Sequence, residues 1–333
     1  MKSLVIAAVA ALIASGVTAE PIKLRADWSA TPAQTPPLMP AALKHAPNLY
    51  THWGKSYVVE PIFVAGGGQN LTNLAANEVE MSALTPVSLA VGTTEAKLDL
   101  RVIAQQMSDF IPGYGHSGFW VRDDIKRVED LKGKIVGINA RASSPEVAAK
   151  IMMARAGLQD GRDYQLVEVR LPAQLATLEA KKTDAAMLIL PFTFMAEKKG
   201  FKELFAVGDA LGPAETVDFV VRADFLAKNR ATLVDFLEDN FRLRRWLYDP
   251  KTRPDAIKLV AEVTKLPEAA FADWVYTKRD YYIDPNGLLD EARLQKNIDD
   301  LHANGVLKTT VKVAPLVDMS LAKEAAARLA KGG

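Results

Sequence analysis

The stretch of residues 134–157, KIVGINARASSPEVAAKIMMARAG, decides the fold that we expect for this chain. Its apolar run IVGI, residues 135–138, is typical of a buried strand, and a helix is predicted after a short loop. Pro145 suits the first helical position, which would make Ser144 the cap. The S-x-x-E spacing that begins at Ser143 instead fits a capping box with Ser143 as the cap. Both alternatives predict the same strand–loop–helix unit.

The start of this predicted helix has the features of an anion site. The first turn of a helix exposes unpaired N–H groups and carries partial positive charge. The hydroxyls of Ser143 and Ser144 and the guanidinium of Arg141 are expected beside it. Asn139 and Ala142 belong to the same loop. Together these groups can hold a carboxylate, a sulfonate or a phosphate. The alternative is an ordinary capped helix next to a solvated arginine.

The composition excludes several classes of function. The chain has 333 residues, of which 49% are hydrophobic, and a formal net charge of +1. This length predicts two domains with ample core, and the balanced charge gives no indication of nucleic-acid binding. The chain contains no cysteine, which excludes disulfides, thiolate catalysis and zinc–thiolate sites. Its four histidines are scattered, and we expect no metal site, no cofactor and no catalytic triad.

The first twenty residues, MKSLVIAAVAALIASGVTAE, are typical of a secretory signal peptide. Lys2 precedes an apolar segment at residues 4–14 that is too short to span a bilayer. The small residues at 17–19 form a cleavage site, so we expect residues 1–19 to be removed and the mature chain to begin at Glu20. No later stretch reaches about 18 consecutive apolar residues. These features predict a soluble protein in the periplasm.

Two predicted βαβ units of similar build occur in the two halves of the chain. The residues Leu71, Leu74 and Glu80 of the first unit recur at the same spacing as Leu175, Leu178 and Asp184. The carboxyl ends of parallel strands lie at one edge of a sheet, where ligand sites are usual. We therefore expect ligand contacts from residues that follow the predicted strands, namely Trp28, Gly68, Gln69, Asn70, Thr85, Asn139, Arg141, Ala142, Ser143, Ser144 and Phe192.

Three segments of the chain resemble the nitrate/taurine-type substrate-binding proteins of ABC importers, a family that includes taurine, alkanesulfonate and thiamine-pyrimidine binders. They are residues 66–86, GGGQNLTNLAANEVEMSALTP, residues 125–157, IKRVEDLKGKIVGINARASSPEVAAKIMMARAG, and residues 171–192, LPAQLATLEAKKTDAAMLILPF. In the family, the loop at the helix start and a proline–aromatic loop contact ligand. The resemblance therefore implies ligand contacts for Arg141, Ala142, Ser143, Ser144 and Phe192.

The resemblance also implies a two-lobed α/β fold, the type II periplasmic-binding-protein fold. The ligand cleft would lie between lobes joined by a hinge that the chain crosses twice, near residues 105–117 and near residues 213–220. Lobe one would comprise residues 20–105 and 218–333, and lobe two residues 106–217. Closure of the lobes around the ligand is the expected motion.

The function implied by the resemblance is solute binding for an ABC importer rather than catalysis. Such a protein captures a small anionic solute and delivers it to an inner-membrane permease with its ATPase. With Arg141, an aromatic pocket would suit an aromatic or heterocyclic carboxylate, and its expected lining is Trp28, Phe110, Tyr114, His116 and Phe192. A small alkylsulfonate is an alternative solute. A thiamine-pyrimidine-type binding protein or related enzyme, and a ligand-binding module of a sensor, are alternative functions.

Overall fold

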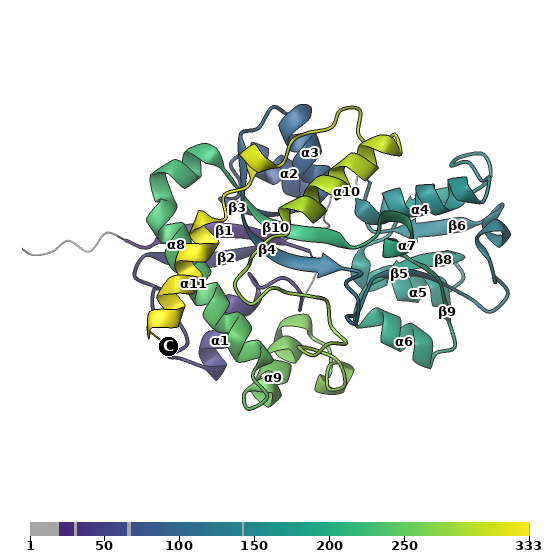
Figure 1. Cartoon of the computed structure of the whole chain (residues 1–333). Helices are drawn as coiled ribbons and strands as arrows, with labels where there is room; N and C mark the ends of the chain where they lie inside the picture. The colour runs from purple at the N-terminus through teal and green to yellow at the C-terminus, as the bar shows by residue number, and fades with distance from the viewer. Residues whose placement is uncertain (1–19, 30–31, 65–67, 142, 333) are drawn as a thin grey trace, which may run out of the picture.

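The computed structural model describes residues 20–29, 32–64, 68–141 and 143–332; the predicted signal peptide lies outside them. The chain forms two five-stranded sheets, one in each lobe (Figure 1), which confirms the expected two-lobed α/β fold. The first sheet has the order β2-β1-β3-β10-β4, with β1 at Ile22–Trp28, β2 at Tyr57–Phe63, β3 at Met81–Leu84, β4 at Leu100–Asp109 and β10 at Ala214–Arg222. The second has the order β7-β6-β8-β5-β9, with β5 at Gly118–Val121, β6 at Ile135–Ile138, β7 at Gln165–Glu168, β8 at Ala185–Leu188 and β9 at Lys202–Ala206.

The two sheets share one topology. Strands β1, β2 and β3 are parallel, as are β6, β7 and β8. Each set is extended by one antiparallel strand, β10 or β5, and an outer strand, β4 or β9, pairs antiparallel with that one. The repeated acids occupy equivalent positions, because Glu80 accepts from the backbone N–H of Arg25 at 2.8 Å and Asp184 accepts from that of Ile135 at 3.0 Å. The repeated spacing in the sequence therefore corresponds to two copies of one βαβαβ unit.

A helix follows each parallel strand. In lobe one these helices are α1 (Leu38–His45), α2 (Gly68–Ala75) and α3 (Pro86–Thr94), and in lobe two they are α4 (Ser144–Arg155), α5 (Gln174–Glu179) and α6 (Phe192–Lys198). The start of each helix consequently lies at the carboxyl edge of its sheet, which is the edge expected to carry ligand.

The central stretch folds as predicted, and the structure decides between the two caps. Ser143 is the cap of α4, because its backbone is extended and its Oγ accepts from the N–H of Glu146 at 3.4 Å. Gly157 ends the unit with a positive φ of 75°, and the N–H of Leu158 returns to the carbonyl of Met153. These bonds satisfy the last carbonyls of the helix, as in a Schellman motif.

The lobe boundaries differ by several residues from those expected. Strand β4 continues to Asp109 and β10 begins at Ala214, and the two pair antiparallel as far as Ala214 opposite Asp109. Residues 106–109 and 214–217, which were expected in lobe two, therefore belong to the first sheet. The chain passes between the sheets at residues 110–117, the first crossing, and at residues 207–213, which include α7 (Val207–Leu211). Figure 1 shows β4 and β10 reaching from one lobe to the other.

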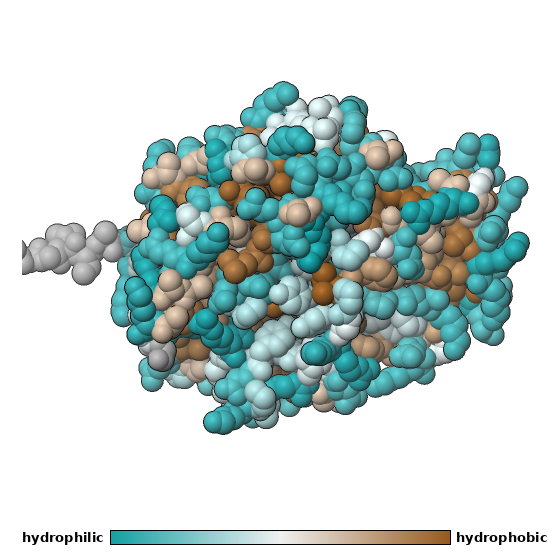
Figure 2. Space-filling view, in the orientation of Figure 1, coloured by the Kyte–Doolittle hydropathy of each residue, from teal (hydrophilic) through white to brown (hydrophobic). Residues whose placement is uncertain are grey.

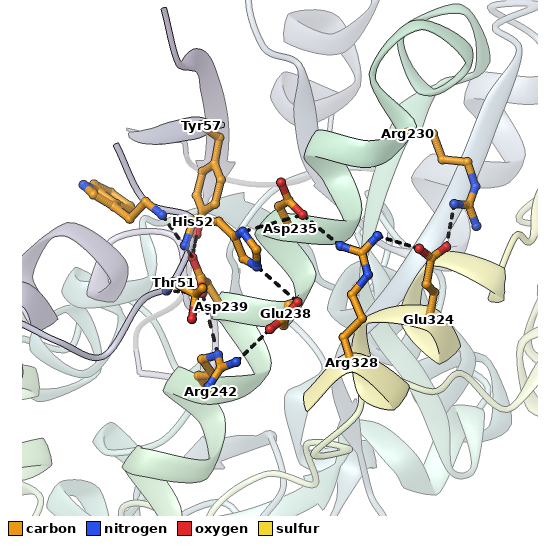
Figure 3. Close-up of polar contacts among 11 residues, drawn as sticks. Thr51, His52, Tyr57, Arg230, Asp235, Glu238, Asp239, Arg242, Glu324 and Arg328 are labelled. Atoms are coloured by element: carbon orange, nitrogen blue, oxygen red, sulfur yellow. Dashed lines mark hydrogen bonds and ion pairs between the residues drawn. The ribbon is translucent and has the colours of Figure 1, made fainter. Parts of the chain in front are cut away.

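Helices of the C-terminal part cover lobe one. They are α8 (Ala223–Tyr248), α9 (Arg253–Thr264), α10 (Glu291–Ala303) and α11 (Ser320–Gly332). Hydrogen bonds and ion pairs of α8 and α11 hold them there. The fully buried carboxylate of Asp239 on α8 accepts from three successive backbone N–H groups, those of residues 51–53, and from the hydroxyl of Tyr57 (Figure 3). Arg328 of α11 bridges Asp235 and Glu324 beside it. One carboxylate thus fixes the loop before β2 to α8.

Residues 271–287, which we call the hinge strap, form no helix and no strand of either sheet. Some of their backbone groups form turns within the strap, and others pair with the hinge. The carbonyl of Tyr282 accepts from Ser108 of β4, and the carbonyl of Asp280 accepts from Gly115 of the first crossing. The hydroxyl of Tyr281 lies 3.0 Å from that of Ser117. The strap therefore contacts both lobes and forms a third element of the hinge.

The surface of the described residues is largely hydrophilic on the face shown in Figure 2. None of their helices is both long enough and apolar enough to cross a bilayer. Figure 2 shows hydrophilic residues spread over both lobes on this face, with apolar residues in separate small patches.

Candidate functional site

A cavity of about 90 Å³ lies between the lobes, beside the hinge. It gathers five of the predicted ligand residues from both lobes: Asn70, Thr85, Asn139, Ser143 and Ser144. Most of its remaining wall is apolar and is formed by Met107, Leu171, Met187, Ile189, Val207, Leu211 and Val217. We call this space the inner cavity.

Two helix starts from opposite lobes meet at the inner cavity. Thr85 caps α3 of lobe one and accepts from the N–H of Ser88 at 3.2 Å, as Ser143 caps α4 of lobe two. A proline occupies one of the first two positions of each helix. Helix starts carry partial positive charge and unpaired N–H groups, so both lobes present a positive dipole end to the same cavity.

The amides of Asn70 and Asn139 are held by short hydrogen bonds. Asn70 Nδ2 donates to the buried carboxylate of Asp27 at 2.7 Å, and that carboxylate also accepts from Ser82 Oγ and from the N–H of Ala83. Burial raises the pKa of Asp27 to about 6. Asn139 Oδ1 lies 3.1 Å from Ser143 Oγ, which turns its Nδ2 donor away from that contact. Fixed donors of this kind orient a ligand at low entropic cost.

Asp109 is an acidic residue of the inner cavity that the sequence analysis did not identify. It ends β4 and is buried, and its Oδ1 accepts from the N–H groups of Phe110 and Ser117 at 2.7 and 3.2 Å. Burial raises its pKa to about 6. Its position at the end of a strand next to the first crossing is the signal by which it could have been found.

Arg141 does not lie where the anion-site hypothesis placed it. Its Nη1 is 3.0 Å from Glu146 Oε1, its Nη2 donates to the carbonyl of Leu166 at 3.0 Å, and its side chain is 49% exposed. Of the residues that the structure describes, no lysine or arginine lines the inner cavity. The physical reason is local: an acid in the first turn of α4 and a carbonyl of the neighbouring strand attract the guanidinium outward.

Trp28 and Phe192 line a second part of the cleft, which we call the outer cavity. It has a volume of about 250 Å³ and shares Ser29, Leu171 and Ile189 with the inner cavity, so the two are continuous. Trp28 packs edge-on against Phe63, with ring centroids 5.0 Å apart. The guanidinium of Arg170 from lobe two lies 5.1 Å from the Phe63 ring. The outer cavity is therefore apolar and aromatic, with a cation at its rim.

The remaining predicted residues lie elsewhere. Gly68 and Gln69 begin α2 but are exposed and line neither cavity. Ala142 is outside the described residues, as are Gly66 and Gly67. Phe110 lines the inner cavity, whereas Tyr114 and His116 line a different one. Across the described ranges, no group of His, Asp and Glu side chains is arranged to hold a metal ion.

Comparison with solved structures shows the same fold in solute-binding proteins and in an enzyme. The alkanesulfonate-binding protein SsuA from Xanthomonas axonopodis pv. citri, bound to MOPS, is 20% identical over 90% of this chain and 99% of that chain, with a TM-score of 0.70. The periplasmic nitrate-binding protein NrtA from Synechocystis PCC 6803 is 14% identical over 93% and 89%, with a TM-score of 0.71. The desulfurization enzyme DSZB is 14% identical over 92% and 99%, with a TM-score of 0.62.

Sequence comparison identifies the family. No protein of curated function matches the chain. The model of the NMT1-like family matches residues 34–261, which include every strand of the two sheets except β1, and both crossings. The expected resemblance is thereby confirmed: the chain belongs to the NMT1-like family and has the fold of nitrate/taurine-type substrate-binding proteins of ABC importers.

Proposed function

We propose that this protein is the periplasmic solute-binding component of an ABC importer and that it captures a small organic anion. The oxyanion group of the solute, a carboxylate or a sulfonate, lies in the inner cavity, and its apolar part lies in the outer cavity. The solute is delivered to an inner-membrane permease with its ATPase. The protein acts by binding and release, without catalysis.

The observation that carries this proposal is the meeting of two helix starts at the inner cavity. Neutral donors and helix dipoles bind oxyanions without a cationic side chain. Here the N–H of Ser144 makes no hydrogen bond among the described residues, and Asn139 adds an amide donor from the same loop. Because Thr85 brings the second helix start from lobe one, closure of the lobes would bring donors to both sides of the anion.

The dimensions of the cleft support a solute with a small polar head and a compact apolar body. The inner cavity of about 90 Å³ is smaller than the ~300–1,000 Å³ typical of pockets for drug-sized ligands. The outer cavity adds about 250 Å³ between Trp28 and Phe192. Aromatic walls contact planar or aliphatic groups over a large area, which favours an aromatic carboxylate or an alkylsulfonate.

A second candidate solute is an uncharged or cationic heterocycle of the pyrimidine type. Asp109 favours it, because this carboxyl lines the inner cavity while no described lysine or arginine does. Such a solute would donate hydrogen bonds to Asp109 rather than accept them from α4. The two candidates therefore make opposite demands on the same cavity.

A pair of substitutions at Ser144 tests the anion site. Ser144→Pro removes both the N–H and the hydroxyl, and proline is favoured at the first position of a helix. Ser144→Ala removes the hydroxyl alone and is the matched control. A thermal-shift screen of carboxylates, sulfonates and pyrimidines first identifies the solute, because a solute at about 100 times its dissociation constant adds about 2.7 kcal/mol of stability.

Calorimetry with the solute so identified then compares the two variants. Ser144→Pro should bind at least about tenfold more weakly than Ser144→Ala, since a hydrogen bond to a charged group contributes about 1.5–3 kcal/mol. Equal affinity of the two variants, with unchanged apo melting temperatures, would exclude the helix start of α4 as the anion site.

A further inference from the structure

A separate cavity of about 340 Å³ lies against the hinge and shares no lining residue with the inner or the outer cavity. Its walls come from the first crossing, from β5, β9 and α6 of lobe two, and from the hinge strap. The volume falls within the ~300–1,000 Å³ of ordinary small-molecule pockets. We call it the strap cavity.

Two residues that line the strap cavity each carry a buried donor that has no hydrogen-bond partner in the described part of the chain. The donors are the indole Nε1 of Trp120 on β5 and the hydroxyl of Thr193 on α6, in residues that are 9% and 5% exposed. An unmade hydrogen bond at a buried group costs about 1–3 kcal/mol, and folded proteins leave few such groups unpaired. Two in the wall of one cavity indicate that a hydrogen-bond acceptor belongs there.

The charges of the strap cavity favour an anionic acceptor. Lys278 and Arg279 of the strap line it, and neither makes an ion pair with a carboxylate in the described part of the chain. The guanidinium of Arg279 lies over the Phe194 ring at 4.7 Å. Of the two acids in the wall, Glu203 is engaged by His116 Nε2 at 3.1 Å. This contact raises the pKa of His116, and with the imidazole protonated three cations face the two carboxylates of Glu197 and Glu203.

We propose that the strap cavity is a second binding site, which takes a small organic carboxylate with an apolar or aromatic body. The carboxylate accepts hydrogen bonds from Trp120 and Thr193 and lies near the cations of the strap. Its body contacts the apolar wall formed by Tyr114, Leu190 and Phe194. A free organic acid and an amino acid share this chemistry, and Glu197 would contact the ammonium group of an amino acid.

The position of the site connects it to the hinge. The N–H of Gly115 donates to the carbonyl of Asp280 at 2.9 Å, and a Cβ at Gly115 would lie 2.3 Å from the carbonyl oxygen of Arg279. The strap therefore runs directly over the first crossing. A carboxylate in the strap cavity contacts α6 of lobe two on one side and the strap on the other, and so joins two elements of the hinge.

The five tryptophans of the chain allow both sites to be followed in one experiment. In ¹H–¹⁵N spectra each indole N–H gives a separate signal, and Trp120→Phe and Trp28→Phe assign two of them by deletion. Trp28 reports on the outer cavity and Trp120 on the strap cavity. The probes are benzoate and L-phenylalanine, which differ in that only phenylalanine carries an ammonium group.

Binding of benzoate should move the Trp120 signal downfield to saturation. Thr193→Val and Arg279→Gln should each weaken that binding about tenfold, as expected for loss of a hydrogen bond to a charged group, while the Trp28 response keeps its affinity. The other indole signals of each variant verify its fold. Tighter binding of phenylalanine would identify an amino acid as the ligand type, and equal or weaker binding a simple organic acid.

Three results would overturn the proposal. In the first, the Trp120 signal moves with neither probe. In the second, it moves in Thr193→Val and in Arg279→Gln with the affinity of the wild type. In the third, it changes together with the Trp28 signal and its response is lost in Ser144→Pro. The last result would show that Trp120 responds only to the cleft. If only the proposed anion site in the cleft is wrong, the Trp28 response changes and the Trp120 response does not, so the two proposals can be tested separately.

Discussion

Asp109→Asn is the substitution that changes the charge of the inner cavity most directly. Asp109→Asn keeps an oxygen at the Oδ1 position, which accepts from the N–H groups of Phe110 and Ser117. It removes a buried charge from the wall of the inner cavity. The substitution therefore acts on folding stability through burial and on solute affinity through electrostatics, and the two effects can be measured separately.

The effect on stability follows from the raised pKa of Asp109. Burial raises this pKa from 3.8 to about 6 in the folded protein, so between pH 4 and 6 the folded state binds more protons than the unfolded state. The free energy of unfolding therefore falls as the pH rises through this window, by about 3 kcal/mol in all from this group, and it falls no further above it. Asp109→Asn should raise the stability at pH 7.5 by up to that amount and flatten its pH dependence. Urea unfolding at pH 4 and pH 7.5 measures both.

The effect on affinity distinguishes the two candidate solutes. Two unit charges about 7 Å apart interact by about 2 kcal/mol at an effective dielectric constant near 20, so Asp109→Asn should bind an organic anion at least about tenfold more tightly at pH 7.5. It should bind a cationic heterocycle more weakly by a similar factor. Calorimetry at pH 7.5 decides. An anion that binds the variant no better than the wild type would refute the placement of its charge in the inner cavity.

The remaining predictions concern three other positions. Arg141→Ala should leave solute affinity unchanged in calorimetry and alter the unfolding free energy by at most about 1 kcal/mol, because the arginine side chain is half exposed and Lys150 also pairs with Glu146. A large loss of affinity would return this residue to the site. Trp28→Ala should weaken binding by about 1–2 kcal/mol without a matching change in the association rate, as stopped-flow fluorescence would show, since the indole contributes contact area rather than charge. Asp239→Asn should lower the unfolding free energy by about 2–4 kcal/mol, because four donors share this carboxylate, whereas Asp235→Asn, a nearby control, should cost less than about 1 kcal/mol in the same urea titration.

Local patterns in the sequence determine much of the architecture. The apolar run of β6 and the helix start at Ser143 or Ser144 are set by neighbours within a few residues. The structure confirms the strand and the helix and decides for Ser143 as the cap. The repeated spacing around Leu74 and Leu178 predicts two similar sheets, because the same short βαβ pattern buries the same positions twice. The edge of the sheets that carries the candidate site follows from the direction of the strands.

Tertiary structure decided which side chains meet. Arg141 follows a predicted strand end as Asn139 does, yet Glu146 and the distant carbonyl of Leu166 draw it out of the cleft. Asp109 enters the inner cavity only because β4 and β10, separated by the whole of lobe two, pair across the hinge. The path of the hinge strap depends on backbone bonds to Ser108 and Gly115, which lie far away in sequence. A local pattern can predict an element, but contacts between distant segments determine the partners of a polar side chain.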